Sequence, residues 1–128
     1  MAKHNRRAWR YEFTRVNPGA WPLPRPPLGA AHSSELSYVF GELQWPGPRP
    51  NPFDAIDRAL ARDMSAAWVR FAATGDPNGG ELPSWPQHTP TDDRRMAFGD
   101  TITVGMDPSA AALDAYDRVF AKMRQVNR

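Results

Sequence analysis

The segment GAAHSSELSYVFG, residues 29–41, sets a histidine in a loop between two glycines and follows it with an apolar patch. Glu35 comes three residues after His32, and Leu36, Val39 and Phe40 are spaced for one helical turn. A lone histidine in a loop is usually structural or solvated, so the role of His32 depends on the segments around it. By itself the segment predicts a histidine loop that leads into a short helical turn.

Proline-rich chain surrounds this loop. Between residues 17 and 54 prolines recur in WPLPRPPLG and WPGPRPNP, and each proline fixes φ and removes a backbone donor. Long helices and central strands are therefore disfavoured here, outside the turn after His32. Before the prolines, Trp9, Tyr11 and Phe13 alternate with polar residues, which predicts a strand over residues 8–16 with one buried face.

The strongest helical signal lies between Asp54 and Gly75. Asp54 can cap the first turn, and Asp57 places a carboxylate near the positive end of the helix dipole. Gly75 tolerates the left-handed conformation that ends many helices, and Pro77 follows it. The predicted inward face collects apolar residues at three- and four-residue steps: Ile56, Leu60, Met64, Trp68 and Phe71.

Two further elements are predicted near the end of the sequence. Alternating apolar residues on both sides of Gly99 and Asp100 predict a hairpin with a two-residue loop: Met96 and Phe98, then Ile102 and Val104. A final helix begins after Asp107 and Pro108, and its predicted inward residues are Leu113, Tyr116, Phe120 and Met123. Because so long a proline-rich connection is unusual in a compact small domain, the organisation is typical of a part of something larger.

The composition narrows the classes of function. The chain has 128 residues, of which 41% are hydrophobic, and this argues against intrinsic disorder. Its 16 Lys and Arg residues are almost balanced by 14 Asp and Glu residues, so we expect no binding to nucleic acid or an anionic membrane. The absence of cysteine excludes disulfides, thiol nucleophiles and cysteine-ligated zinc. We also expect neither a membrane span nor a cleaved secretory leader, and the compartment stays open.

Two segments carry a family resemblance. GAAHSSELSYVFG is similar to the histidine loop of the type B carboxylesterases, which include bacterial para-nitrobenzyl esterases and cholinesterases and share the pattern Gly-Ala-x-His-x-x-Glu-Leu-x-Tyr-Val-Phe-Gly. MSAAWVRFAATGDPNGGELPSWPQHTP, residues 64–90, resembles the next segment of that family, and the resemblance covers about residues 8–104 in the family's order. It implies an α/β-hydrolase fold that cleaves carboxylic esters through an acyl-enzyme, with a Ser, acid, His triad in that chain order and no cofactor or metal.

The resemblance also assigns residues. His32 matches the catalytic histidine, which takes the serine proton during attack and returns it to the leaving alcohol. Glu35 matches an acidic position to which we assign a supporting hydrogen-bond role outside the triad. Ser33 and Ser37 stand where relatives often have Gly or Pro, which bears on the stiffness of the loop.

The other parts of such an active site have no counterpart in this sequence. None of the serines lies in a Gly-x-Ser-x-Gly elbow: 33, 34, 37, 65, 84 and 109. Glu12 is the only carboxylate before His32 and falls within the predicted strand, and no His-Gly-Gly run offers an oxyanion hole. We therefore expect residues 1–128 to form a single partial domain, the C-terminal portion of an α/β-hydrolase. It would have an incomplete sheet of two or three strands and two main helices, and would not hydrolyse esters alone.

Two alternatives remain open from the residues. The chain can complete an active site with a separate N-terminal esterase segment that carries the nucleophile, or associate with itself through exposed strands. Alternatively, PLPRPP at residues 22–27 and PGPRP at residues 46–50 can form polyproline-II ridges of a non-enzymatic interaction module.

Overall fold

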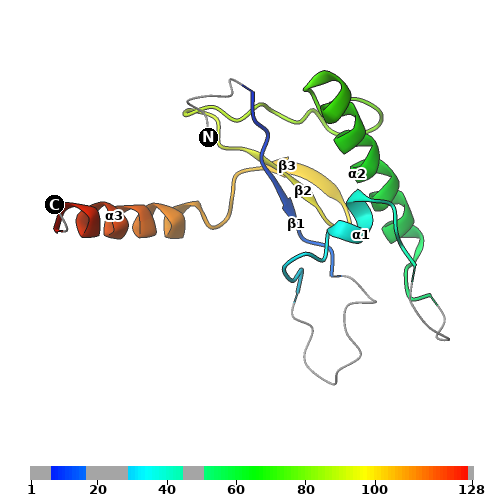
Figure 1. Ribbon diagram of the computed structural model, residues 1–128, viewed down its shortest axis with the longest axis horizontal. Coiled ribbons are helices and arrows are strands. Elements are labelled where there is room, and N and C mark those ends of the chain that lie inside the picture. The colour runs from blue at the N-terminus through cyan, green and yellow to red at the C-terminus, as the bar shows by residue number, and fades with distance from the viewer. Residues whose placement is uncertain (1–6, 17–28, 45–50, 127–128) are drawn as a thin grey trace.

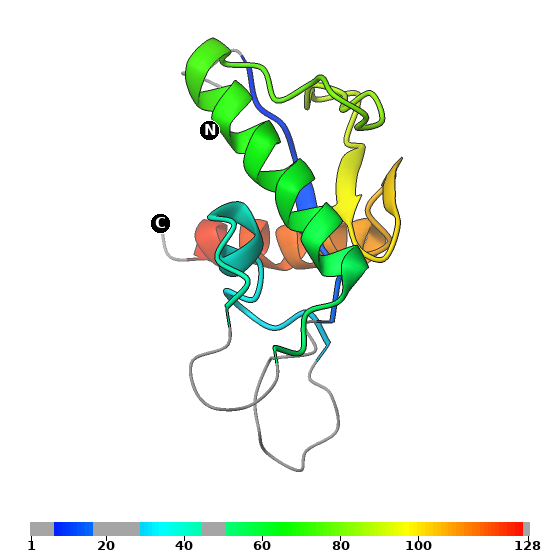
Figure 2. The same ribbon diagram turned by 90° about the vertical axis from the view of Figure 1, so that its right-hand side faces the viewer.

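The computed structural model describes residues 7–16, 29–44 and 51–126. Along the chain lie β1 (Tyr11–Phe13), α1 (Leu36–Val39), α2 (Ala55–Thr74), β2 (Arg95–Phe98), β3 (Ile102–Gly105) and α3 (Ala110–Val126) (Figure 1). The strands form one sheet in the order β1-β2-β3, in which β2 is parallel to β1 and antiparallel to β3. Helix α2 lies along one face of this sheet (Figure 2). Both proline-rich motifs, residues 22–27 and 46–50, fall outside the described residues.

The ends of α2 confirm the sequence prediction. Asp54 is extended, its side chain accepts the Asp57 backbone N–H at 2.9 Å, and Asp57 accepts the Asp54 N–H at 2.8 Å. This reciprocal capping box satisfies two backbone donors that the first turn leaves free. At the other end Gly75 has φ of +73° and donates its N–H to the Phe71 carbonyl at 2.7 Å.

The buried face of α2 is rotated from the predicted one. The prediction is correct for Leu60 and Met64, but Ile56 is 42% exposed and Phe71 43% exposed. The reason is that the Asp57 side chain is fully buried in the first turn, so the inward stripe runs from Asp57 rather than from Ile56. The core under this stripe holds aromatic and sulfur-containing side chains from α1, the strands and the loops: Tyr38, Phe53, Trp85, Met96 and Phe98.

The sheet is as predicted in type but not in extent. Strand β1 has three residues instead of nine, although Thr14 still donates to the Phe98 carbonyl at 2.8 Å and Met96 to the Arg10 carbonyl at 3.0 Å. The hairpin between β2 and β3 is confirmed, but pairing of Phe98 with Ile102 leaves a loop of three residues, 99–101, instead of two. Three strands give an incomplete α/β sheet.

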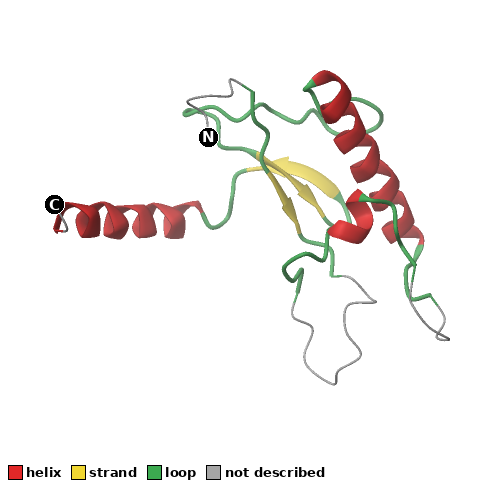
Figure 3. Ribbon diagram, viewed as in Figure 1, coloured by secondary structure: helices red, strands yellow, loops and turns green. Residues whose placement is uncertain are grey.

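Helix α3 forms where the sequence predicts it, but it does not pack as predicted. It projects away from the sheet and from α2 (Figures 1 and 3). The residues expected to face inward are 47% to 63% exposed: Leu113, Tyr116, Phe120 and Met123. Their spacing correctly indicates an amphipathic helix, but the described chain supplies no surface that covers the apolar side. Among the described residues, no helix is both long and apolar enough to cross a membrane.

Candidate active site

The His32 loop is a sequence of tight turns held by local hydrogen bonds. Gly29 has φ of +70°, and the turn that follows is closed by the N–H and the hydroxyl of Ser34, which donate to the Ala31 carbonyl at 3.1 and 2.6 Å. Ser33 has φ of +67°, a left-handed conformation that is strained for a residue with a side chain. His32 is exposed at the surface of this turn.

Helix α1 anchors the end of the loop through Tyr38. The Glu35 carbonyl accepts the N–H groups of Tyr38 and Val39 at 2.9 and 3.0 Å, which joins the turn directly to the helix. The Tyr38 side chain is fully buried, while Phe40, predicted as part of an apolar patch, is 72% exposed. Sequence reasoning missed Tyr38 as the anchor. The available signal is an aromatic residue that directly follows the serine-rich turn, residues 33–37.

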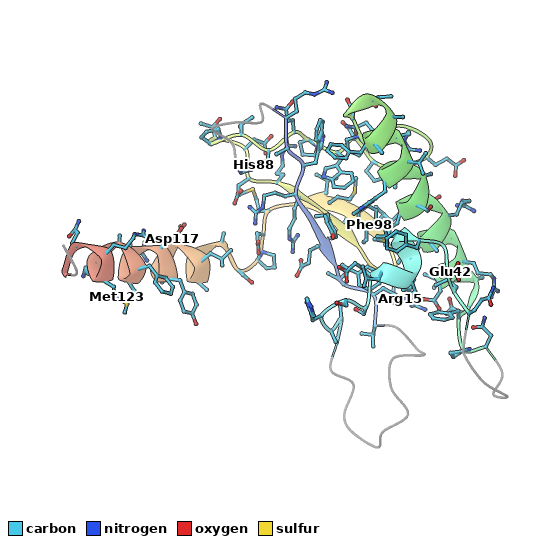
Figure 4. The ribbon with its side chains drawn as sticks, in the orientation of Figure 1. Arg15, Glu42, His88, Phe98, Asp117 and Met123 are labelled. Carbon is cyan, nitrogen blue, oxygen red and sulfur yellow. The ribbon has the colours of Figure 1, made fainter. Side chains whose placement is uncertain are left out.

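The Tyr38 hydroxyl belongs to an ionic cluster around the buried Asp57 carboxylate. It donates to Asp57 Oδ1 at 2.8 Å, and Arg15 Nε donates to the same oxygen at 2.8 Å. The remaining guanidinium nitrogens of Arg15 bind Asp54 Oδ2 at 2.9 Å and Asp100 Oδ1 at 2.8 Å. Figure 4 shows Arg15 at the end of the sheet where α1 and the first turn of α2 meet. One guanidinium thus links the chain just after β1 to the start of α2 and to the β2–β3 turn.

The charge state of Asp57 follows from these contacts. Burial on its own raises the pKa of this carboxyl, but the hydrogen bonds from Arg15, the Asp54 backbone and Tyr38 outweigh it and lower the pKa below its ordinary value. On Tyr38, burial and then the hydrogen bond to the Asp57 carboxylate both act in one direction: they raise the phenol pKa well above its ordinary value. The cluster is therefore ionised at Asp57 and protonated at Tyr38 at neutral pH.

His32 itself has no side-chain partner in the part of the chain that the structure describes. All six serines lie in the described ranges, and none of them bonds to a histidine there. Burial and then the negative charge of Glu35 raise the pKa of Tyr11 in β1. The roles given to His32 and Glu35 by the family resemblance thus remain predictions.

A second histidine, His88, does lie beside a carboxylate. Its Nδ1 is 3.3 Å from Asp93 Oδ1, but the Arg10 guanidinium forms an ion pair with the same oxygen. His88 lies at the other end of the sheet from Arg15 (Figure 4). Within the described residues, no group of three His, Cys, Asp or Glu side chains could hold a metal ion.

Comparison with known proteins decides the family. The carboxylesterase family model matches residues 1–115. The chain belongs to the carboxylesterase family. It is 36% identical over 96 residues to carboxylesterase 4A of Bos taurus, and 37% identical over 123 residues to the fumonisin B1 esterase of Sphingopyxis macrogoltabida. These matches cover 75% and 87% of this chain, but 16% and 21% of the two relatives.

The fold agrees with this membership. A carboxylesterase of Geobacillus stearothermophilus superposes on the chain with a TM-score of 0.63 at 31% sequence identity. The superposition covers 85% of this chain and 22% of that structure. The chain therefore has part of an α/β-hydrolase fold, and spans about a fifth of the length of the carboxylesterases it matches.

Proposed function

We propose that this chain supplies the histidine loop of a serine carboxylesterase and turns over esters only when a second polypeptide segment supplies the nucleophilic serine and the triad acid. The observation that carries the proposal is the exposed His32 on a turn anchored by buried Tyr38, in a member of the carboxylesterase family in which, among the described residues, no serine is hydrogen-bonded to this histidine. Without a hydroxyl to activate, an imidazole has no acyl transfer to catalyse.

In the completed site His32 acts as a general base and then as a general acid. Its imidazole takes the proton of the serine hydroxyl as the oxygen attacks the ester carbonyl, and returns it to the departing alcohol. A second cycle with water releases the acid from the acyl-enzyme. Glu35 has a supporting role outside the triad: no bond joins it to the imidazole among the described residues, and its carbonyl accepts the Tyr38 and Val39 N–H groups that join the turn to α1.

We assign the second segment to the open edge of β1. Parallel strands normally lie within a sheet, whereas an antiparallel strand such as β3 commonly ends one. Beside β1 lies an apolar hollow of about 190 Å³, whose lining includes Trp9, Tyr11, Trp68 and Phe71. No other described strand pairs with this edge, so it offers backbone groups and a place for an apolar side chain to an added strand.

The test combines hydrolysis with reconstitution. The purified chain is assayed on para-nitrophenyl acetate and butyrate, alone and together with the Geobacillus carboxylesterase from which the region matched by this chain has been removed. We expect neither polypeptide to exceed the imidazole background alone, and the mixture to turn over and to label with a fluorophosphonate probe.

Two variants make the reconstitution specific. His32→Ala should abolish turnover in the mixture, whereas His88→Ala, which removes the other described histidine, should retain it. Turnover and labelling by the chain alone would contradict the proposal. Absence of a complex by size-exclusion chromatography, or self-association in its place, would contradict the assignment of the partner.

A further inference from the structure

We infer that Tyr38, Asp57 and Arg15 form a positioning network that sets where the His32 loop stands relative to the sheet. This inference rests on the proposed function of His32 and names residues that act on the same site without touching substrate. The three side chains come from α1, from the first turn of α2 and from the chain just after β1. They meet at one carboxylate oxygen, Asp57 Oδ1.

The loop and α1 move as one unit because hydrogen bonds join each turn to the next. The Ser34 N–H binds the Ala31 carbonyl, the Leu36 N–H binds the Ser33 carbonyl at 3.3 Å, and the Tyr38 N–H binds the Glu35 carbonyl. Tyr38 comes six positions after His32, and these bonds span the interval. A displacement of Tyr38 is therefore transmitted to His32.

Tyr38 is the side chain that ties this unit to the rest of the fold. Its ring packs against Phe13 with centroids 4.9 Å apart and against Phe53 with centroids 6.1 Å apart. Ring packing leaves the ring free to slide, whereas the bond from the hydroxyl to Asp57 has a fixed length and direction. The hydroxyl thus sets the position of α1 along α2.

Asp57 is a rigid acceptor for that bond. Its side chain is fully buried, and its oxygens accept from Arg15 Nε, from the Tyr38 hydroxyl and from the Asp54 backbone N–H. Arg15 in turn is held by the carboxylates of Asp54 and Asp100 on two other elements. Loss of the Tyr38 hydroxyl leaves Asp57 with the donors Arg15 Nε and the Asp54 N–H. We therefore expect the fold to be kept while α1 loses its hydrogen bond to α2.

This difference makes Tyr38→Phe the informative variant. Phenylalanine keeps the ring, so a changed signal at His32 reports movement of the loop and not a lost ring current. The measurement is the NMR cross-peaks of the His32 imidazole and of the backbone amides of residues 31–35. His88 serves as an internal reference in the same spectra, and Tyr116→Phe removes a hydroxyl from a tyrosine that is 63% exposed on α3.

We expect Tyr38→Phe to shift or broaden the His32 signals while those of His88 stay in place, and Tyr116→Phe to leave both unchanged. Arg15→Lys, which keeps the charge but loses the forked contacts, should move the His32 signals in the same way and provides the result if Tyr38→Phe does not fold. Folded variants with unchanged His32 signals would overturn the inference.

The reconstituted enzyme gives a second readout. A displaced general base lowers kcat and leaves substrate binding intact, and a misplacement of about 1 Å can cost on the order of 10²-fold. We expect Tyr38→Phe to lower kcat by at least about tenfold with KM unchanged, because a shift of the loop smaller than about 1 Å costs less than that full factor. An unchanged kcat would overturn the inference, whereas a failed reconstitution contradicts the proposed function and leaves the NMR result to decide on the network.

Discussion

Replacement of Asp57 by asparagine tests the buried cluster most directly. The substitution keeps the size of the side chain but removes the charge, and a single amide oxygen cannot replace both carboxylate oxygens. Either the Asp54 N–H or the pair of donors at Oδ1, Arg15 and Tyr38, loses its acceptor. Removal of one partner from a buried ion pair costs about 3–5 kcal/mol, and we expect about 3 kcal/mol because Arg15 keeps Asp54 and Asp100.

The assay is urea unfolding followed by tryptophan fluorescence. With a slope of about 2 kcal/mol per molar urea, a loss of about 3 kcal/mol lowers the midpoint by about 1.5 M. Asp100→Asn is the matched control, because Asp100 binds the same guanidinium at 2.8 Å but its side chain is 73% exposed. An exposed pair contributes at most about 1 kcal/mol, so its midpoint should fall by less than about 0.5 M. Equal shifts in the two variants would refute the reasoning from burial.

Three further predictions use the same assay. Because the pKa of Asp57 is lowered in the folded state, its stabilisation is present above the ordinary carboxyl pKa of about 4 and is lost as the pH falls through the native value; Asp57→Asn should flatten this acid-side loss. Met64→Ala, at a fully buried position, should cost about 2–5 kcal/mol, whereas Phe120→Ala, at a position 51% exposed, should stay within about 0.5 kcal/mol. Gly75→Ala should cost about 1–2 kcal/mol because φ is +73° and an added Cβ lies 2.6 Å from a guanidinium nitrogen; Gly105→Ala, with open space around it, should be nearly neutral.

Local features of the fold could be predicted from the sequence because neighbouring residues determine them. The start of α2 at Asp54 and its end at Gly75 follow from capping chemistry, which needs contacts only three or four residues apart. The β2–β3 hairpin likewise follows from alternation around Gly99. The length of β1 could not be predicted in this way, because pairing with β2 more than 80 residues later decides where that strand ends.

The buried cluster shows the limit of local reasoning most clearly. Arg15 and Asp57 are polar residues that a periodicity analysis places on the surface, and only the fold brings them together. The family resemblance predicts a catalytic role for His32 through the residues that follow it, including Tyr38, yet it gave no reason for a tyrosine at that position. That reason is the bond to Asp57, a residue 19 positions further along the chain.

The apolar stripe of helix α3 has no covering surface among the described residues. An apolar stripe in a helix indicates that this side is to be buried, but it does not specify which surface covers it. On α2 the covering surface is the sheet of the same chain, and the pattern predicts the packing with a small rotation. On α3 the same pattern leaves Leu113 and Tyr116 exposed, and the relatives are about five times longer than the matched region. The exposed stripe of α3 and the open edge of β1 thus support the same proposal, that this chain acts with a further part of the carboxylesterase fold.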